Sequence, residues 1–283
     1  MRELAGKTAF VTGGGSGIGF ALGEAFAELG MKVMLADVEA DPLAAAVTQL
    51  RNRGWAVHGI TCDVADPASV ERAARASFDT FGTVHVVCNN AGVAARGGID
   101  DISLDNWRWV LDVNLMGVVH GIHAFLPHIR AHGEGGHFVN TASMAGLNSG
   151  LGFSPYSASK FAVVNISEGL AARLKPLGIG VSVLCPGFVR TRINESGRNR
   201  PERYGPASVP DPASPAGILR ARLIELTQSG IDPVDVAAQV VSAIRDEELY
   251  VFTHPGPGWR AGLEERFGAI LAAMDKAASR GRP

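Results

Sequence analysis

Tyr156 and Lys160 lie four residues apart, and Ser143 lies upstream of them. Residues at this spacing share one face of a helix. A free tyrosine has a pKa of about 10, so a tyrosine acting as a base near neutral pH needs that pKa lowered by about three units, or about 4 kcal/mol. The ammonium group of Lys160 would favour the Tyr156 phenolate. The spacing therefore predicts proton exchange with an alcohol or a ketone, with Tyr156 as base in oxidation and acid in reduction.

A glycine-rich run, Thr12-Gly13-Gly14-Gly15-Ser16-Gly17-Ile18-Gly19, lies between a strand-like segment and a helical pattern. At such a turn the bare backbone can approach a pyrophosphate, and the helix N-terminus faces its charge. The spacing is Gly-x-x-x-Gly-x-Gly, which differs from the common Gly-x-Gly-x-x-Gly fingerprint. An ordinary turn is the alternative, but the position between strand and helix favours a dinucleotide site.

Asp37 ends the predicted second strand, 18 residues after Gly19. A carboxylate there can accept hydrogen bonds from both hydroxyls of an adenosine ribose and would repel a 2′-phosphate. Neither the glycine-rich run nor Val38 supplies the cation that a phosphorylated cofactor needs. We therefore predict NAD rather than NADP, with a helix cap or loop role for Asp37 as the alternative.

Further polar residues follow the next two predicted strands. Asp63-Val64 would hold the adenine edge, and Asn89-Asn90-Ala91-Gly92 would line the cofactor with small residues while the amides fasten neighbouring strands. Each segment alone could be an ordinary turn, but successive strand ends meet at one edge of a parallel sheet.

Strand-like and helix-like segments alternate along the chain, which predicts an α/β fold. Strands joined through helices are parallel, and their crossovers are right-handed, giving a doubly wound, mostly parallel seven-stranded sheet with helices on both faces. The predicted strands are 7–12, 32–36, 56–61, 84–88, 136–142, 180–185 and 250–253, and the main helices are 41–53, 67–81, 103–131 and 154–176.

The composition of the 283 residues fits a single NAD-binding domain over 1–283. The chain is 46% apolar and 19% charged, and its net charge of -2 argues against nucleic acid as a partner. Cys62, Cys88 and Cys185 fall in or beside apolar runs, as expected of buried thiols in a reducing cytoplasm. No signal segment or membrane span is expected.

Two segments stand outside the alternation. Residues 188–230 contain five prolines, all between 201 and 215. This composition predicts a long irregular insertion that acts as a substrate lid. Residues 258–279 carry one apolar stripe and predict an amphipathic C-terminal helix that packs on the body or on a partner subunit.

Over residues 5–255 the chain resembles the short-chain dehydrogenase/reductase family. The matching motifs are Thr12-Gly13-x-x-x-Gly17-x-Gly19, Asn89-Asn90-Ala91-Gly92, Asn114, Ser143, Tyr156-x-x-x-Lys160, and Pro186-Gly187 followed by Thr191. The resemblance implies a Rossmann-type fold, a nicotinamide cofactor and hydride transfer.

The resemblance also implies residue roles. Ser143 would bind the substrate oxygen, Asn114 would support a water through which Lys160 exchanges protons, Lys160 would also bond the nicotinamide ribose, and Thr191 would contact the carboxamide. The catalytic residues are then Asn114, Ser143, Tyr156 and Lys160. The expected cofactor contacts are Gly13, Gly15, Ser16, Gly17, Ile18, Gly19, Asp37, Asp63, Val64, Asn90, Ala91, Gly92, Tyr156, Lys160, Pro186, Gly187, Val189 and Thr191.

The segments 192–204 and 141–147 are similar to those of a subgroup that oxidises the benzylic alcohol of lignin-derived aryl ethers. This similarity implies a small-molecule substrate that is a bulky aromatic secondary alcohol. The expected substrate contacts are Ser143, Met144, Leu147, Phe153, Tyr156 and Phe188, with Leu151 beside them. Arginines 192, 198, 200 and 203 would pair with Glu195 and Glu202 in a solvated lid, or else bind an acidic substrate.

His120, His123, His128 and His132 share one predicted helix. No carboxylate or cysteine stands near them at a metal-ligand spacing, so we expect no metal and assign them to the helix surface or a subunit contact. In the family, this helix and the one that bears Tyr156 commonly form the dimer face, so the resemblance implies a homodimer or a homotetramer.

Two other functions remain open. An NADP-dependent carbonyl or acyl-chain reductase would use the same polar residues, but Asp37 disfavours it. A catalytically silent NAD-binding regulator would need the glycine-rich run and Asp37 without Ser143, Tyr156 and Lys160, and the presence of all three argues against it.

Overall fold

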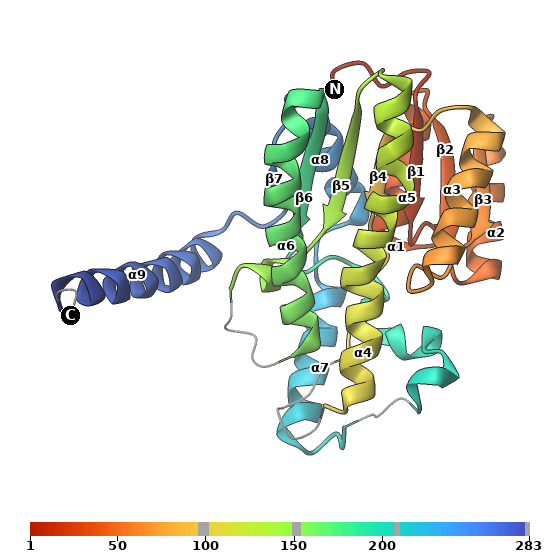
Figure 1. The fold of residues 1–283 in the computed structure, drawn as a ribbon. Coiled ribbons are helices and arrows are strands. Elements are labelled where there is room, and N and C mark those ends of the chain that lie inside the picture. The colour runs from red at the N-terminus through yellow and green to blue at the C-terminus, as the bar shows by residue number, and fades with distance from the viewer. Residues whose placement is uncertain (96–101, 149–153, 207–209, 281–283) are drawn as a thin grey trace.

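The protein is built on one seven-stranded parallel sheet in the order β3-β2-β1-β4-β5-β6-β7. The computed structural model describes residues 1–95, 102–148, 154–206 and 210–280. The predicted doubly wound, Rossmann-type sheet is confirmed (Figure 1). The strands are β1 (Thr8–Thr12), β2 (Lys32–Asp37), β3 (Val57–Thr61), β4 (Val86–Asn89), β5 (Gly136–Thr141), β6 (Ile179–Cys185) and β7 (Tyr250–Phe252).

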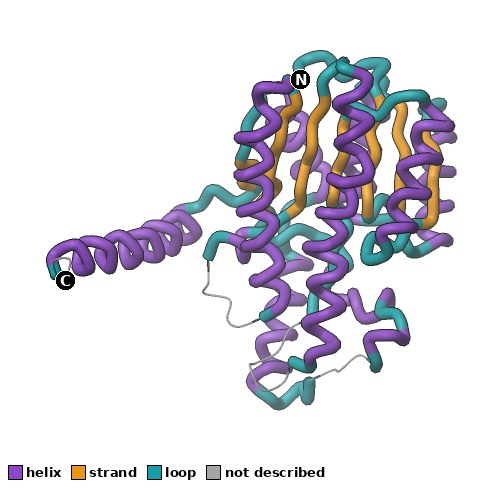
Figure 2. The backbone as a smooth tube through the Cα atoms, in the orientation of Figure 1, coloured by secondary structure: helices purple, strands orange, loops and turns teal. Residues whose placement is uncertain are grey.

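Helices cover both faces of the sheet (Figure 2). One apolar core joins the strands to α1 (Gly17–Glu28), α2 (Ala40–Arg51) and α8 (Pro233–Asp246). A second core, on the other face, joins them to α3 (Pro67–Phe81), α5 (Gly117–His132) and α6 (Pro155–Leu174). Every residue of β1, β4 and β5 is buried, as is usual for central strands of a sheet that helices cover on both sides.

Buried amides tie the central strands together, as the sequence predicts for Asn89 and Asn90. Asn89 Nδ2 donates to Asn140 Oδ1 at 2.9 Å across β4 and β5, and Asn140 Nδ2 donates to Ser167 Oγ of α6 at 3.1 Å. The backbone N of Asn90 donates to Thr12 Oγ1 at 2.9 Å, which joins the end of β4 to the end of β1. These bonds satisfy polar groups inside the core and fix the strand ends relative to one another.

The predicted helix over 103–131 is a continuous helix from Leu104 to His132, made of α4 (Leu104–Leu111), a π-helical turn η1 (Asp112–Met116) and α5. Among the described residues, it is the helix whose length and composition would allow it to cross a membrane. Its apolar content has another explanation, because Val118, Ile122, Phe125 and Ile129 pack in the core beneath the sheet. The predicted helix therefore holds, while the π-helical turn has no counterpart in the prediction.

The segment 188–230 lies beyond the carboxyl ends of the strands (Figure 1). It contains two 3₁₀ segments, η5 (Ile193–Asn199) and η6 (Glu202–Tyr204), and the α-helix α7 (Pro215–Gln228). The prediction of an irregular insertion is therefore wrong for α7. Pro215 occupies the first turn of this helix, where its missing N–H costs nothing, and Ser214 caps the helix by accepting from the N of Gly217.

The predicted C-terminal helix is present as α9 (Pro257–Ser279), which extends away from the sheet (Figure 1). Trp259 and Leu263 pack on the core, whereas Phe267, Ile270, Leu271 and Met274 are exposed. Packing on the body is therefore confirmed for the first turns only. Packing of the rest on a partner, and the homodimer or homotetramer, stay predictions that light scattering would test.

His137 lies on β5 and is fully buried, and its Nε2 and Ser182 Oγ lie 2.9 Å apart. Its Nδ1 has no hydrogen-bond partner among the described residues. A Cβ on Gly180, its neighbour on β6, would stand 2.3 Å from that atom, so only glycine fits beside the ring. Burial lowers the pKa of His137 to about 3, which keeps the ring neutral.

His137 should make the fold sensitive to acid. In the unfolded chain a histidine takes up a proton near pH 6.5, while the folded chain leaves His137 neutral until about pH 3. The unfolded state therefore binds more protons between these values, and stability is lost as the pH falls through this window, at about 1.4 kcal/mol per pH unit. Urea unfolding at pH 7 and pH 5 measures the loss. The His137→Gln variant should lose less on acidification than the wild type, and His123→Gln, at an exposed position of α5, should behave like the wild type. Equal losses in all three proteins would contradict the assignment.

Candidate active site

A cavity of about 490 Å³ lies beyond the carboxyl ends of the strands. Its wall runs from the loop after β1 to the first turn of α9, and it includes the ends of β2, β3, β4, β5 and β6. The order of the sheet reverses between β1 and β4, and ligands of doubly wound folds bind at such a reversal. The volume is within the ordinary range for a small-molecule site.

The glycine-rich turn forms one wall of this cavity. Gly13 and Gly17 have φ angles of +69° and +55°, which side chains other than glycine rarely adopt. A Cβ on Gly19 would lie 2.1 Å from the carbonyl oxygen of Gly13, so the turn closes onto α1 only with glycine at this position. Ser16 precedes α1 without making a side-chain cap, and Ser16, Gly17 and Ile18 line the cavity. The first amides of α1 can therefore face an anion, as a dinucleotide site requires.

Asp37 is held beside the glycine-rich turn at the end of β2. Its Oδ2 accepts from the N of Gly15 at 2.9 Å, and its Oδ1 accepts from the N of Glu39 at 3.0 Å. The side chain is 9% exposed and lines the cavity. These two bonds fix the carboxylate while leaving acceptor capacity on each oxygen, since an ionised carboxylate has about four lone-pair sites. The geometry fits recognition of ribose hydroxyls.

Asn114 fixes the loop that follows β4. Its Oδ1 accepts from the N of Val93 at 2.8 Å, and its Nδ2 donates to the O of Val93 at 3.0 Å and to Ser159 Oγ at 3.2 Å. Asn114 is fully buried in the π-helical turn η1 and is not on the cavity wall. Gly92 lies next to it, because a Cβ there would stand 3.4 Å from Asn114 Oδ1 and 3.6 Å from Lys160 Nζ. The amide thus aligns the loop after β4 with α6.

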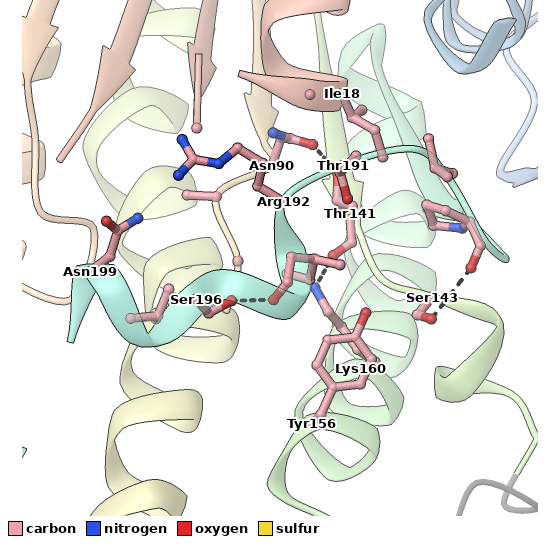
Figure 3. A pocket seen from close by; sticks show the side chains of 18 of the residues that line it. Ile18, Asn90, Thr141, Ser143, Tyr156, Lys160, Thr191, Arg192, Ser196 and Asn199 are labelled. Carbon is pink, nitrogen blue, oxygen red and sulfur yellow. Dashed lines mark hydrogen bonds between the residues drawn. The ribbon is translucent and has the colours of Figure 1, made fainter. Parts of the chain in front are cut away.

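Tyr156 and Lys160 lie in the first two turns of α6 and line the cavity together with Ser143 (Figure 3). Ser154 caps α6, and Pro155 begins it. The Nζ of Lys160 is 5.6 Å from the centre of the Tyr156 ring and donates to the carbonyl oxygen of Thr141, at the end of β5, at 2.7 Å. The ammonium is therefore held beside the phenol.

Ser143 follows β5 and caps the short 3₁₀ turn η2 (Met144–Gly146). Its Oγ accepts from the N of Ala145 at 3.1 Å and donates to the carbonyl oxygen of Pro186 at 3.3 Å. The long second bond can be exchanged for one to a ligand oxygen. Ser143 is thus fixed in place with a hydroxyl proton available to a substrate.

Lys160 is 3% exposed, and burial lowers its pKa to about 8, with a smaller opposing effect from Cys185. The amine keeps its proton at neutral pH, so it provides a positive charge in a poorly hydrated position. Electrostatic attraction is stronger there than in water.

The three cysteines are free and buried, as expected from the sequence. Burial raises the pKa of Cys62 to about 11 and that of Cys185 to about 12, and it also raises that of Cys88. All three stay thiols at neutral pH, so they are packing residues and not nucleophiles.

The structure brings most of the predicted site residues to the cavity wall. They are Gly13, Ser16, Gly17, Ile18, Asp37, Asp63, Val64, Asn90, Ala91, Gly92, Ser143, Met144, Tyr156, Lys160, Pro186, Gly187, Phe188, Val189 and Thr191. Gly15 and Gly19 lie behind the wall, where they shape the turn. Leu147 belongs to the second apolar core and is not on the cavity wall, so its contact with a substrate stays a prediction. Phe153 and Leu151 lie outside the described residues.

Sequence reasoning missed several parts of the wall. Trp109 and Val113 come from the long helix that ends in α5, Leu219, Leu223 and Thr227 come from α7, and Trp259 comes from α9. The apolar stripe of α9 is a usable signal for Trp259, although by itself it indicates packing. Helix α7 gave a weaker signal, because the prolines before it suggest a loop.

The lid arginines pair with carboxylates, though mostly not those expected. Arg192 pairs with Glu195 at 2.8 Å, as predicted. Arg198 pairs with Glu39, after β2, at 2.8 Å, and Arg203 pairs with Asp63, after β3, at 2.8 Å. The hydrogen bond from Arg198 lowers the pKa of Glu39.

Arg200 has a different environment. It donates to the backbone O of Gly205, to the O of Tyr204 and to Asn106 Oδ1, and it lies 5.0 Å from the Trp109 ring. The segment Ile193–Tyr204 is thereby fastened to the loops after β2 and β3 and to α4. We name these contacts the lid clasp: Arg198–Glu39, Arg203–Asp63 and Arg200–Asn106.

The histidines of the long helix make separate contacts. His120 Nδ1 lies 2.9 Å from the O of Val64, and the His128 ring lies 4.0 Å from the Phe78 ring. His132, His85 and Glu134 form a cluster whose ligand atoms lie within 4.8 Å of one another, so a carboxylate does stand near His132 in space. Both ring nitrogens of His85 and of His132 already have partners within the protein. The cluster is therefore a hydrogen-bonded network at the amino ends of the central strands β4 and β5.

The family model for short chain dehydrogenases matches residues 7–202. The chain therefore belongs to the short-chain dehydrogenase family. Its relatives include dehydrogenases, which are oxidoreductases. It is 35% identical over 275 residues to the C alpha-dehydrogenase of Sphingobium sp. strain SYK-6, covering 97% of this chain and 88% of that protein. This relative confirms the predicted resemblance to the aryl-ether dehydrogenase subgroup.

A second relative is the 1-deoxy-11-beta-hydroxypentalenate dehydrogenase of Streptomyces exfoliatus, which is 42% identical over 254 residues. The match covers 89% of this chain and 84% of that protein. Among solved structures, a short chain dehydrogenase/reductase from Burkholderia phymatum in complex with NAD matches with a TM-score of 0.91 and 40% identity. The match covers 96% of this chain and 97% of that one. A nicotinamide cofactor fits the glycine-rich turn and Asp37 described above.

Replacing Lys160 by methionine should separate stability from activity. Because burial lowers the pKa of Lys160 from about 10.5 to about 8, keeping its charged form buried costs about 3 kcal/mol. Methionine removes this cost but leaves the Thr141 carbonyl without its donor, which costs about 1–3 kcal/mol. We expect the unfolding free energy of Lys160→Met at pH 7 to equal or exceed that of the wild type, and turnover to fall at least about 100-fold.

The same pKa shift predicts how the unfolding free energy changes with pH. Between pH 8 and 10.5 the unfolded chain holds a proton that the folded wild type has released, so the wild type gains stability as the pH rises, and Lys160→Met should not. Urea unfolding at pH 7 and 9, with cofactor absorbance for turnover, tests both parts. Lys175→Met, at an exposed position, is the control. A variant that keeps wild-type turnover would refute the role of the ammonium.

Proposed function

We propose that this protein is an NAD-dependent oxidoreductase that interconverts a secondary alcohol and a ketone. The observation that carries the proposal is the joint position of Tyr156, Lys160 and Ser143 on one wall of a cavity whose other wall is the glycine-rich turn. NAD supplies the hydride acceptor when it is bound. The remaining chemistry, which is proton transfer and orientation, falls to the side chains of this chain.

Tyr156 takes the hydroxyl proton during oxidation and returns it during reduction. Lys160 favours the phenolate by its charge, and its bond to the Thr141 carbonyl keeps the ammonium in place. Ser143 donates to the substrate oxygen and thereby orients the reacting carbon. Asn114 lies behind the cavity wall, and its side chain is engaged by Val93 and Ser159. The second acceptor site of its Oδ1 could still hold the water through which Lys160 would exchange protons. Thr191, which packs against Gly17, would contact the carboxamide.

The preference for NAD rests on Asp37. Its carboxylate stands at the end of β2, where a 2′-phosphate would meet a negative charge. Arg192 and Arg198 do approach this side, but both are paired with glutamates. An NADP-dependent carbonyl or acyl-chain reductase remains the alternative. The solved relative in complex with NAD supports the first choice.

The substrate that we propose is a bulky aromatic secondary alcohol. Aromatic and aliphatic side chains form the far wall of the cavity, among them Phe188, Trp259, Leu219 and Leu223. The name of the C alpha-dehydrogenase relative agrees with this class. The hydroxypentalenate dehydrogenase relative, which is 42% identical over 254 residues, makes a bulky alicyclic alcohol the second candidate. We further propose a cytoplasmic homo-oligomer without nucleic-acid or membrane partners.

The proposed reaction is tested with Tyr156→Phe, which keeps the ring and removes the proton carrier. A panel of aryl, alicyclic and aliphatic secondary alcohols is mixed with NAD, and NADH absorbance is followed. We expect wild-type turnover with at least one bulky alcohol and at least about a 100-fold loss in Tyr156→Phe. Wild-type turnover in the variant would exclude Tyr156. An absence of NAD-linked turnover with every alcohol and ketone would favour the silent regulator.

The cofactor choice is tested with the double variant Asp37→Ala and Val38→Arg. The change removes the repelling carboxylate and adds a cation for a 2′-phosphate. We expect kcat/KM for NAD to fall and that for NADP to rise, so that the ratio shifts by about 100-fold or more towards NADP. Asp235→Ala, on α8 and away from the cavity, should leave the ratio unchanged. A wild type that already prefers NADP would overturn the assignment.

A further inference from the structure

The outer end of the cavity is walled by two aromatic side chains from separate segments. Phe188 follows β6, and Trp259 lies in the first turn of α9. Their ring centres are 6.4 Å apart at an interplanar angle of 46°. Both rings are half-buried and both line the cavity, so part of each aromatic surface is open to a ligand.

Phe188 is fixed by its backbone. Its carbonyl oxygen accepts from the N of Ile231 at 3.1 Å, and Val189 pairs with Ile231 in an isolated bridge. A Cβ on Gly230 would lie 2.3 Å from the same oxygen, so the two segments touch there. The ring of Phe188 therefore projects from a backbone that is held from the side of α7 and α8.

Trp259 is fixed by the docking of the chain before α9. A Cβ on Gly187 would lie 2.7 Å from His254 Nδ1, and the N of Gly187 donates to Thr253 Oγ1 at 3.1 Å. Pro257 is the first residue of α9. Trp259 then packs on the apolar core that contains Met144. The two aromatic rings thus come from segments that dock on one another, and they meet at the cavity.

This aromatic wall adjoins the reacting groups. Phe188 lies two residues after Pro186, whose carbonyl accepts from Ser143 Oγ at 3.3 Å and from the N of Met144 at 2.9 Å. A substrate oxygen held by Ser143 is therefore close to the wall. A separation of 6.4 Å is too short for a third ring to enter between the two, since each stacked contact needs about 3.5 Å. A substrate ring would instead pack onto the angled surface that they present.

We propose that Trp259, together with Phe188, is a specificity-determining residue that holds an aromatic ring attached at or next to the carbon being oxidised. The inference rests on the proposed alcohol oxidation and deepens it. Trp259 supplies the larger ring and comes from a helix beyond the part of the chain that the family model matches. The wall favours neutral rings, because the side chains that form it are apolar.

The experiment compares 1-phenylethanol with 2-butanol, using NAD and following NADH absorbance. Trp259→Ala should lower the ratio of kcat/KM for the aryl alcohol over the alkyl alcohol about tenfold, mainly through KM, because an aromatic contact is lost. The KM for NAD should stay within about twofold. Trp259→Phe keeps an aromatic face and should restore most of the ratio.

A matched control separates the wall from the docking of α9. Leu263 lies one turn further along the same stripe, packs on the same core and is not on the cavity wall. Leu263→Ala should therefore leave the ratio unchanged, even if it lowers the melting temperature. An equal fall in Leu263→Ala, or no fall in Trp259→Ala, would overturn the inference while leaving the alcohol oxidation intact. A wild type that oxidises no alcohol with NAD would reject the proposed function, and this inference with it.

Discussion

The site depends on one ammonium group that is held out of water. Lys160 Nζ donates to the Thr141 carbonyl, which ties the first turns of α6 to the end of β5. The chain after β5 lies directly against α6, because a Cβ on Gly146 would stand 2.6 Å from the carbonyl oxygen of Lys160. This close contact places Ser143 and Tyr156 on the same wall. Burial of this charge lowers the stability of the fold, which is a cost typical of residues that are placed for function.

The lid clasp links the segment Ile193–Tyr204 to the loops after β2 and β3 and to α4. Glu39 and Asp63 follow β2 and β3, where the cofactor is expected, and each is bonded by a lid arginine. A pair that is partly exposed contributes little alone, about 1 kcal/mol or less. Several such contacts act on one short segment, however, and Tyr204 adds a bond to Asp112 Oδ2 at 2.9 Å. Contacts that act on one segment share its ordering entropy, so we expect lid order and cofactor binding to influence one another.

The sequence was sufficient where local chemistry decides the structure. Glycine spacing, the strand ends at Asp37 and Asn90, and the pair Tyr156 and Lys160 all follow from rules that act within a few residues. Contacts between distant segments were not accessible in this way. Nothing local shows that Arg198 reaches Glu39, 159 residues earlier, or that Asn114 sits in a π-helical turn. Pro215 misled because proline either ends a helix or starts one, and only the Ser214 cap decides between them.

The cavity is lined partly by residues within the part of the chain that the family model matches and partly by residues of α7 and α9 that lie after it. The glycine-rich turn, Ser143, Tyr156 and Lys160 all lie within residues 7–202, the part that the family model matches, and they define the redox chemistry. The far wall is completed by Leu219 and Leu223 of α7 and by Trp259 of α9, which lie after that part. Family membership therefore identifies the reaction without identifying the alcohol. The choice of substrate has to be derived from the shape and chemistry of the later helices. In this chain they present apolar and aromatic surface on the same cavity wall as Ser143.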